Sequence, residues 1–270
     1  MVAGRAADAL SFAAAQPADT SLLTDQVLTA SQKLKPLTVV TVGTVEGSGN
    51  AVVPVTVRQA DRTREWQVPV IFTARGWRLS KVTSEVTLDS IPAGLNVTLN
   101  GQALPAGPTA TVFPGAYQVA DSLAEIDLRD KPLIVDAPGT VFNVELSPVL
   151  TNAGKKKLRA LALDSLKTCL AQRSINPKGC PNVAAAAKGQ TVIDKTVRWS
   201  VQGDPWAKAS YDVSAVKPTE ASGKATFTFR LVCSLKQDGA TYQINQTIPY
   251  PVLFTADLAE QQPTIVWQRL

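Results

Sequence analysis

Apolar and polar side chains alternate with a period of two over much of this chain. The alternation is clearest between Lys224 and Lys236, where five apolar side chains point to one side: Phe227, Phe229, Leu231, Cys233 and Leu235. This period is typical of a half-buried antiparallel strand, and the turn at 237–240 predicts a hairpin with the next strand. Similar stretches predict further strands at 37–45, 51–59, 65–73, 77–82, 191–201, 209–217, 241–254 and 264–268.

Two stretches instead have the period of an α-helix. In residues 153–172, Thr151 or Asn152 is the expected N-cap, and one face carries Leu158, Leu161, Ala162, Leu166, Cys169 and Leu170. Nearer the N-terminus, Asp19 or Thr20 is the expected cap of a helix whose shared face is Leu23, Val27, Ala30 and Leu34. A helix of this kind buries its apolar face against another layer. The sequence therefore predicts a multidomain α+β protein of small antiparallel β-sheets with packed helices.

The segment from Glu85 to Val119 alternates turns and strands with particular regularity. The pair Asn100-Gly101 is the strongest short signal for a hairpin, because the common type I′ hairpin turn requires positive φ at both positions. A Pro-x-Gly turn at 91–94 precedes this hairpin, and Pro114-Gly115 precedes a strand that contains Tyr117. The segment predicts a small β-domain.

This order of strand, Pro-x-Gly turn, strand ending in Asn-Gly, and Pro-Gly turn before an aromatic strand resembles the PEGA domain over about residues 85–121. The resemblance implies a central all-β module without catalytic residues, in a family found mainly in bacterial surface proteins. It therefore implies an extracytoplasmic, non-enzymatic protein of the cell envelope. The stretch 65–82 resembles the closing hairpin of NTF2-like domains, because Trp77 follows the last turn, and a cystatin-like α+β unit fits it equally well.

Length and composition favour a modular protein. The 270 residues, 45% of them hydrophobic, suffice for two or three cores. We expect a helix-plus-sheet domain at 1–82, the PEGA-like β-module at 83–147, and a second helix-plus-sheet domain at 148–270. No apolar run is long enough to span a membrane, and the first residues lack the apolar core of a signal peptide. We therefore expect a membrane anchor or signal upstream of these residues.

Three cysteines and the absence of histidine limit the chemistry. Cys169 and Cys180 enclose a short segment in which Pro177 and Gly179 let the chain turn back, which predicts a disulfide and an oxidising compartment. Cys169 also fits a buried thiol, and Cys233 fits either a core residue or an alternative partner of Cys169. Without histidine, Ser-His-Asp and Cys-His catalysis is excluded, and the cysteine spacing fits no zinc pattern. We expect no catalytic residue, metal or cofactor.

Positive charge is concentrated in the C-terminal half. The chain has a net charge of +5, but the segment from Gly154 to Lys208 alone holds eleven Lys and Arg against three Asp. This asymmetry predicts an anion-binding face, and a solvated face without a ligand is the alternative. The candidate anion-binding residues are Lys155, Lys156, Lys157, Arg159, Lys167, Arg173 and Lys178.

Trp206 is the candidate for stacking against a ligand, since it lies in the turn 203–206, where an indole is less easily buried than in a strand. The other four tryptophans fall within predicted strands and are expected in the core. The predicted partner is an anionic cell-wall polymer or an envelope protein rather than nucleic acid. We expect the upstream anchor to attach the protein to the membrane. A structural spacer with no ligand is the alternative function.

Overall fold

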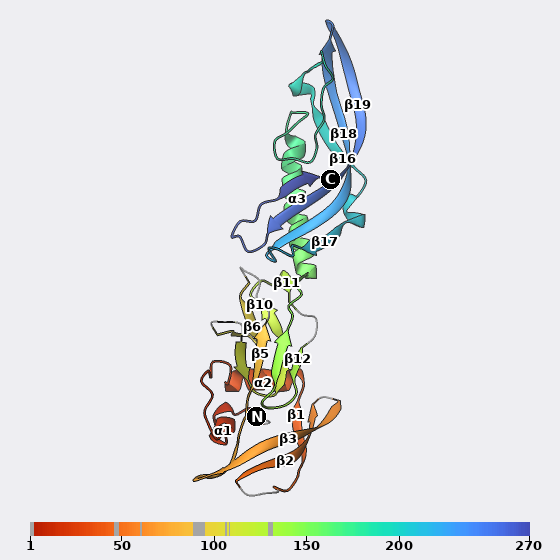
Figure 1. Cartoon of the computed structure of the whole chain (residues 1–270). Coiled ribbons are helices and arrows are strands. Elements are labelled where there is room, and N and C mark those ends of the chain that lie inside the picture. The colour runs from red at the N-terminus through yellow and green to blue at the C-terminus, as the bar shows by residue number, and fades with distance from the viewer. Residues whose placement is uncertain are drawn as a thin grey trace. The chain divides into compact units, whose positions relative to one another are not determined.

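The chain forms two compact units (Figure 1) in a computed structural model that describes residues 3–45, 49–59, 61–88, 95–105, 107, 109–128 and 132–270. Unit 1 comprises Met1–Ser122 and Asp127–Pro148, and unit 2 comprises Leu123–Ile126 and Val149–Leu270. Strands account for 45% of the chain and helices for 17%, so the fold is mainly β-sheet. The chain passes from one unit to the other three times, after Ser122, after Ile126 and after Pro148.

The four strands predicted in the N-terminal part are confirmed as one antiparallel sheet. They follow one another across the sheet in chain order: β1 (Leu37–Val42), β2 (Asn50–Gln59), β3 (Arg62–Thr73) and β4 (Gly76–Leu79). The buried face carries Val57, Trp66 and Val68. Nearer the β3–β4 turn this face is open to solvent, and Phe72 and Trp77 pair edge to face there, with ring centroids 5.3 Å apart. The prediction of Trp77 as a core residue is wrong, because it is 36% exposed.

The helix predicted near the N-terminus is present as α2 (Asp25–Leu34). Its N-cap is Thr24, whose hydroxyl accepts a hydrogen bond of 3.2 Å from the backbone N–H three residues later. The predicted cap at Asp19 or Thr20 is wrong, because Asp19 instead accepts from the N–H of Ser21 in a turn before the helix. A shorter helix, α1, spans Ala6–Ser11.

α2 packs mainly against β9 (Gly115–Tyr117). The hydroxyl of Ser31 accepts a hydrogen bond of 2.8 Å from the N–H of Ala116. A Cβ on Gly115 would lie 2.3 Å from that hydroxyl oxygen, so glycine lets the helix approach this closely. The buried residues of α2 are consequently Val27, Leu28 and Ser31, while Leu34, predicted on the buried face, is 39% exposed.

Short strands form three further small sheets in unit 1, with the orders β10–β6–β7, β12–β9 and β13–β5–β8. The predicted hairpin at Asn100-Gly101 is confirmed, with φ of 50° and 80°. The predicted turn at 91–94 lies outside the described residues. β13 runs parallel to β5, so the expectation of antiparallel sheets is wrong there. The strands are β5 (Ser84–Leu88), β6 (Val97–Leu99), β7 (Gln102–Ala103), β8 (Thr109–Val112), β10 (Val119–Asp121), β12 (Leu133–Val135) and β13 (Val141–Val144).

Unit 2 consists of α3 (Asn152–Ala171) packed on one large antiparallel sheet (Figure 1). β18 (Glu220–Gln237) and β19 (Ala240–Asp257) pair along their whole length. The predicted hairpin turn between them is confirmed, with φ of 49° at Asp238 and 77° at Gly239. β20 pairs with β19, and the other edge of β18 pairs with three short strands; the bounds are β15 (Thr191–Val192), β16 (Arg198–Gln202), β17 (Ser210–Val213) and β20 (Val266–Arg269). Two further short strands, β11 (Ile126–Asp127) and β14 (Val149–Leu150), lie where the chain passes from one unit to the other.

The continuous strand predicted at 191–201 is interrupted by a 3₁₀ turn, η1 (Asp194–Thr196). The reason lies in the hydroxyl of Thr196, which accepts a hydrogen bond of 2.8 Å from the N–H of Ser234 on β18. The hydroxyl of Thr196 therefore takes the place of the backbone carbonyl that would accept from Ser234 if the strand were continuous.

The core of unit 2 is aromatic and agrees with the sequence patterns. All five apolar residues predicted to face one way on β18 are at most 7% exposed. The ring of Phe227 contacts those of Trp206, Phe229 and Trp267, with centroid distances of 5.2, 5.8 and 5.8 Å. The helix contributes Leu158, Ala162, Leu166 and Cys169, as its periodicity predicts.

Candidate functional site

The start of α3 is tightly anchored within unit 2. Thr151 is the N-cap, and its hydroxyl accepts a hydrogen bond of 3.1 Å from the N–H of Gly154, as predicted. A Cβ on Gly154 would lie 2.3 Å from the carbonyl oxygen of Glu125, so glycine allows the segment 123–126 to lie against the first turn. The carboxylate of Glu125 accepts from Lys157 at 2.8 Å, and this hydrogen bond lowers the pKa of Glu125.

Four of the seven candidate cations have partners within unit 2. Lys157 and Lys167 form ion pairs with Glu125 and Asp164. The guanidinium of Arg173 donates to the carbonyl of Val197 at 3.0 Å, and that of Arg159 lies over the ring of Trp206. The other three are exposed and form no ion pair within the described part of the chain: Lys155, Lys156 and Lys178.

The structure separates these seven residues into groups at the two ends of α3. From Lys155 to Lys167 the helical rise gives a distance of about 18 Å along the axis, and Arg173 and Lys178 follow the end of α3. We name Lys155, Lys156 and Arg159 the helix-start cluster. It presents two unpaired ammonium groups and one guanidinium at the N-terminal end of the helix.

Trp206 is partly buried and packs against the core of unit 2. It lies in η2 (Pro205–Lys208), which Asp204 caps by accepting from the N–H of Trp206 at 2.9 Å. Its ring meets Phe227 and Phe254 edge to face, and the guanidinium carbon of Arg159 lies 5.7 Å from its centroid. These contacts account for the indole without a ligand, because a molecule stacked on that face would have to displace Arg159. Trp206 therefore packs against both the core of unit 2 and the guanidinium of Arg159.

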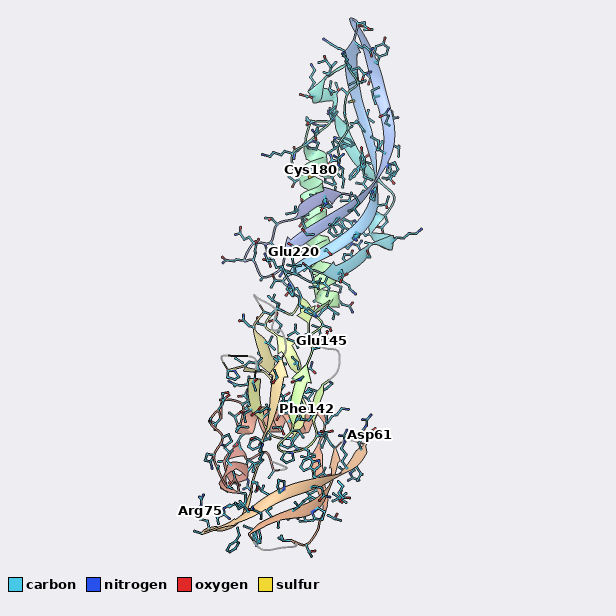
Figure 2. The ribbon with its side chains drawn as sticks, in the orientation of Figure 1. Asp61, Arg75, Phe142, Glu145, Cys180 and Glu220 are labelled. Carbon is cyan, nitrogen blue, oxygen red and sulfur yellow. A yellow bond between two sulfur atoms is a disulfide. The ribbon has the colours of Figure 1, made fainter. Side chains whose placement is uncertain are left out.

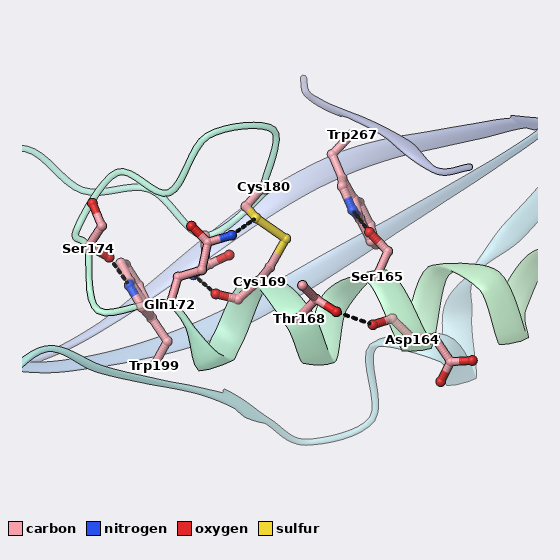
Figure 3. The surroundings of a disulfide bond; sticks show 10 residues. Asp164, Ser165, Thr168, Cys169, Gln172, Ser174, Cys180, Trp199 and Trp267 are labelled. Carbon is pink, nitrogen blue, oxygen red and sulfur yellow. Dashed lines mark hydrogen bonds between the residues drawn. A yellow bond between two sulfur atoms is a disulfide. The ribbon is translucent and has the colours of Figure 1, made fainter.

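The predicted disulfide is present: Cys169, in the last turn of α3, is bonded to Cys180 (Figure 3). Cys169 is also 3% exposed, so its place on the apolar helix face and its place in the bond are compatible. The alternative pairing with Cys233 is wrong, since Cys233 is a free, buried thiol whose pKa is raised by burial. Near the bond, the indole nitrogen of Trp199 donates to the carbonyl of Ser174 at 2.8 Å.

A hollow of about 550 Å³ lies beside the disulfide. Its lining includes the positively charged side chains of Lys178 and Arg269, together with Trp267 and Cys180. The guanidinium carbon of Arg269 lies 5.6 Å from the centroid of Tyr250. Sequence reasoning identified Lys178 and missed Arg269, because no local signal connects the last strand to the loop that follows α3.

In the described residues, His, Cys, Asp and Glu side chains form no group of three or more that could hold a metal ion. No helix among these residues has both the length and the apolar character needed to cross a membrane. No family model, curated protein or solved structure matches the chain.

Proposed function

We propose that this chain is the extracytoplasmic, non-enzymatic part of a membrane-anchored bacterial envelope protein, and that unit 2 binds an anionic cell-wall polymer. The charge of unit 2 carries the proposal. Unit 2 holds sixteen Lys and Arg against nine Asp and Glu, a net charge of +7, whereas unit 1 holds eleven against thirteen, a net charge of −2. Ion pairs in unit 2 engage Lys157, Lys167 and Lys217. Much of its positive charge is thus left for an anionic partner.

The helix-start cluster is the part of unit 2 best suited to phosphate groups. Lys155 and Lys156 are exposed on the first turns of α3, where the helix dipole disfavours positive charge. A bound anion offsets that repulsion. The cap, the close contact at Gly154 and the disulfide at the far end hold α3 in place. Because the helix backbone is already ordered, binding has to immobilise only the lysine side chains.

Two observations support the proposed location. A disulfide persists in oxidising compartments and is uncommon in the cytosol. The PEGA-like pattern of the central strands is typical of bacterial surface proteins, and a PEGA-like module at 83–147 between two helix-plus-sheet domains belongs to the same proposal. The tight hairpin at Asn100-Gly101 supports that module.

The proposal is tested by measuring binding of the full chain to immobilised poly(glycerol phosphate) at low and at physiological salt. We expect binding that weakens as salt rises, because the contacts are between exposed charges. The double variant K155Q/K156Q should bind about tenfold more weakly at low salt. The matched control K188Q/K195Q removes two exposed lysines from elsewhere in unit 2 and should bind almost as the parent does.

Equal losses in the two double variants would show that only net charge matters and would remove the helix-start cluster from the account. Absence of binding by the parent chain at low salt would reject polymer binding and leave a structural spacer as the function. Thermal unfolding of each variant checks that the fold is retained.

A further inference from the structure

A hollow of about 290 Å³ in unit 1 lies beside the end of the β2–β3 hairpin, at β12. Its polar lining comes from Gln59 on β2, Asp61, Arg62 and Arg64 from the hairpin, and Lys35 directly after α2. Asp61 lies at the exposed tip of the hairpin (Figure 2). The hollow thus collects three cations and one carboxylate from three different elements.

Gln59 is the unusual member of this lining. It is 7% exposed, and its side-chain nitrogen has no hydrogen-bond partner among the described residues. Register explains the burial, because Gln59 is paired with Leu37 on β1, and Leu37 faces the core at 2% exposure. A buried amide donor without an acceptor is destabilising. A ligand that supplies an oxygen acceptor removes this penalty.

The cations stand on the same side of the sheet as Gln59. Arg62 is its cross-strand partner, and Arg64 is the next residue on that face of β3. Arg64 forms an ion pair with Asp136, which fixes its guanidinium. Neither Lys35 nor Arg62 forms an ion pair within the described residues. The donors therefore outnumber the acceptors, and the hollow is suited to an oxyanion.

We propose that this hollow binds a phosphate group, held by the guanidinium of Arg62, the ammonium of Lys35 and the amide nitrogen of Gln59. Arg64 contributes a fixed positive charge, part of which Asp136 neutralises. Asp61 restricts the choice of ligand. Its carboxylate accepts hydrogen bonds, so it favours a ligand with a hydroxyl beside the phosphate over a ligand with a second negative charge there. A small phosphate ester carrying a hydroxyl fits both requirements.

The test is a nuclear magnetic resonance titration of the ¹⁵N-labelled full chain at constant ionic strength. Inorganic phosphate, dimethyl phosphate and acetate are the probes. We expect a saturable shift of the Gln59 side-chain NH₂ signals with a phosphate probe and no saturation with acetate. Tighter binding of inorganic phosphate assigns the site to monoesters, and tighter binding of dimethyl phosphate assigns it to diesters.

Two variants and one control decide whether the named residues hold the ligand. R62Q should weaken phosphate binding about tenfold, whereas R75Q, which changes an arginine at the other turn of β3, should leave it unchanged. Q59M should abolish the interaction while keeping or raising the melting temperature, because it removes the unpaired donor. Linear shifts with every probe, or equal affinities of R62Q and R75Q, would overturn the proposal. This proposal is independent of polymer binding, because Lys155 and Lys156, the residues changed to test polymer binding, lie in unit 2 and the hollow lies in unit 1.

Discussion

The two units each contain a hairpin with the same turn geometry but hold it in different ways. In unit 2, Asp238 and Gly239 connect two eighteen-residue strands whose stability comes from a shared aromatic core. In unit 1, Asn100 and Gly101 connect strands of two and three residues, and the side chain of Asn100 is buried. The side-chain amide of Asn100 forms hydrogen bonds with the backbone of α2 and with the backbone of β9 and the residue that follows it. Where apolar strands are long, packing is sufficient; where they are short, buried polar contacts connect the small sheets.

The largest effect is expected from the core of unit 2. Replacing Phe227 by Ala removes a fully buried ring with three aromatic neighbours and should lower the free energy of unfolding by about 4 kcal/mol. Hydrogen exchange followed by mass spectrometry should show the loss of protection in residues 149–270. The control T226A changes an exposed residue on the same strand and should change little. Equal loss of protection in unit 1 would argue against the distinction between the units.

Removal of the disulfide should have the next largest effect. The bond closes a loop with a sequence separation of 11, and in the chain-entropy model C169S/C180S lowers the free energy of unfolding by about 3 kcal/mol. Denaturant unfolding measures this change. Reduction of the parent protein with dithiothreitol should produce a similar decrease and leave the variant unaffected. A variant as stable as the oxidised parent would show that the core alone fixes the end of α3.

The two turns offer the sharpest comparison. N100G keeps a residue suited to positive φ but removes hydrogen bonds to the carbonyls of Val27 and Ala116 and from the N–H of Gln118, so it should destabilise unit 1 by about 2 kcal/mol. D238G changes the equivalent turn position in unit 2 and should change stability by less than ~0.5 kcal/mol. Denaturant unfolding compares them, and similar values for the two variants would refute the different roles assigned to the turns.

The smallest effect concerns the ion pair at the start of α3. The hydrogen bond from Lys157 lowers the pKa of Glu125 below its usual value of 4.5. A lowered carboxyl pKa stabilises the fold above the usual pKa, and this contribution disappears as the pH falls through the folded-state value. Because Lys157 is 37% exposed, the contribution should stay under ~1 kcal/mol. The deficit of K157M measured at pH 7 should shrink as the pH is lowered through the folded-state pKa of Glu125; a deficit that does not change with pH would contradict the assignment.

Local patterns predicted those elements whose partners are close in sequence. The alternation from Lys224 to Lys236 identified β18 and its buried face, and the spacing of Cys169 and Cys180 indicated the disulfide. On the predicted face of α2, Val27 is buried but Leu34 is exposed. Ser31 is buried instead, because its hydroxyl accepts a hydrogen bond from Ala116, far along the chain. The parallel pairing of β13 with β5 likewise depends on a long-range contact that no local pattern records.

The candidate sites were predictable only as lists of residue types. Charge counting found the cations around α3 but placed them in one patch, whereas the helix separates them. It also could not anticipate that Arg159 lies over Trp206, because that contact depends on how η2 packs against the helix. The hollow at Gln59 combines residues from three elements and became visible only through the burial of an unpaired amide.

The central claim, that this chain works outside the cytoplasm, is tested most directly by counting thiols in the protein recovered from its native cells. The sample is denatured in an alkylating reagent without a reductant, and the labelled cysteines are located by mass spectrometry. The account predicts one labelled cysteine per chain, the buried Cys233, with Cys169 and Cys180 protected by their bond. Three labelled cysteines would contradict it.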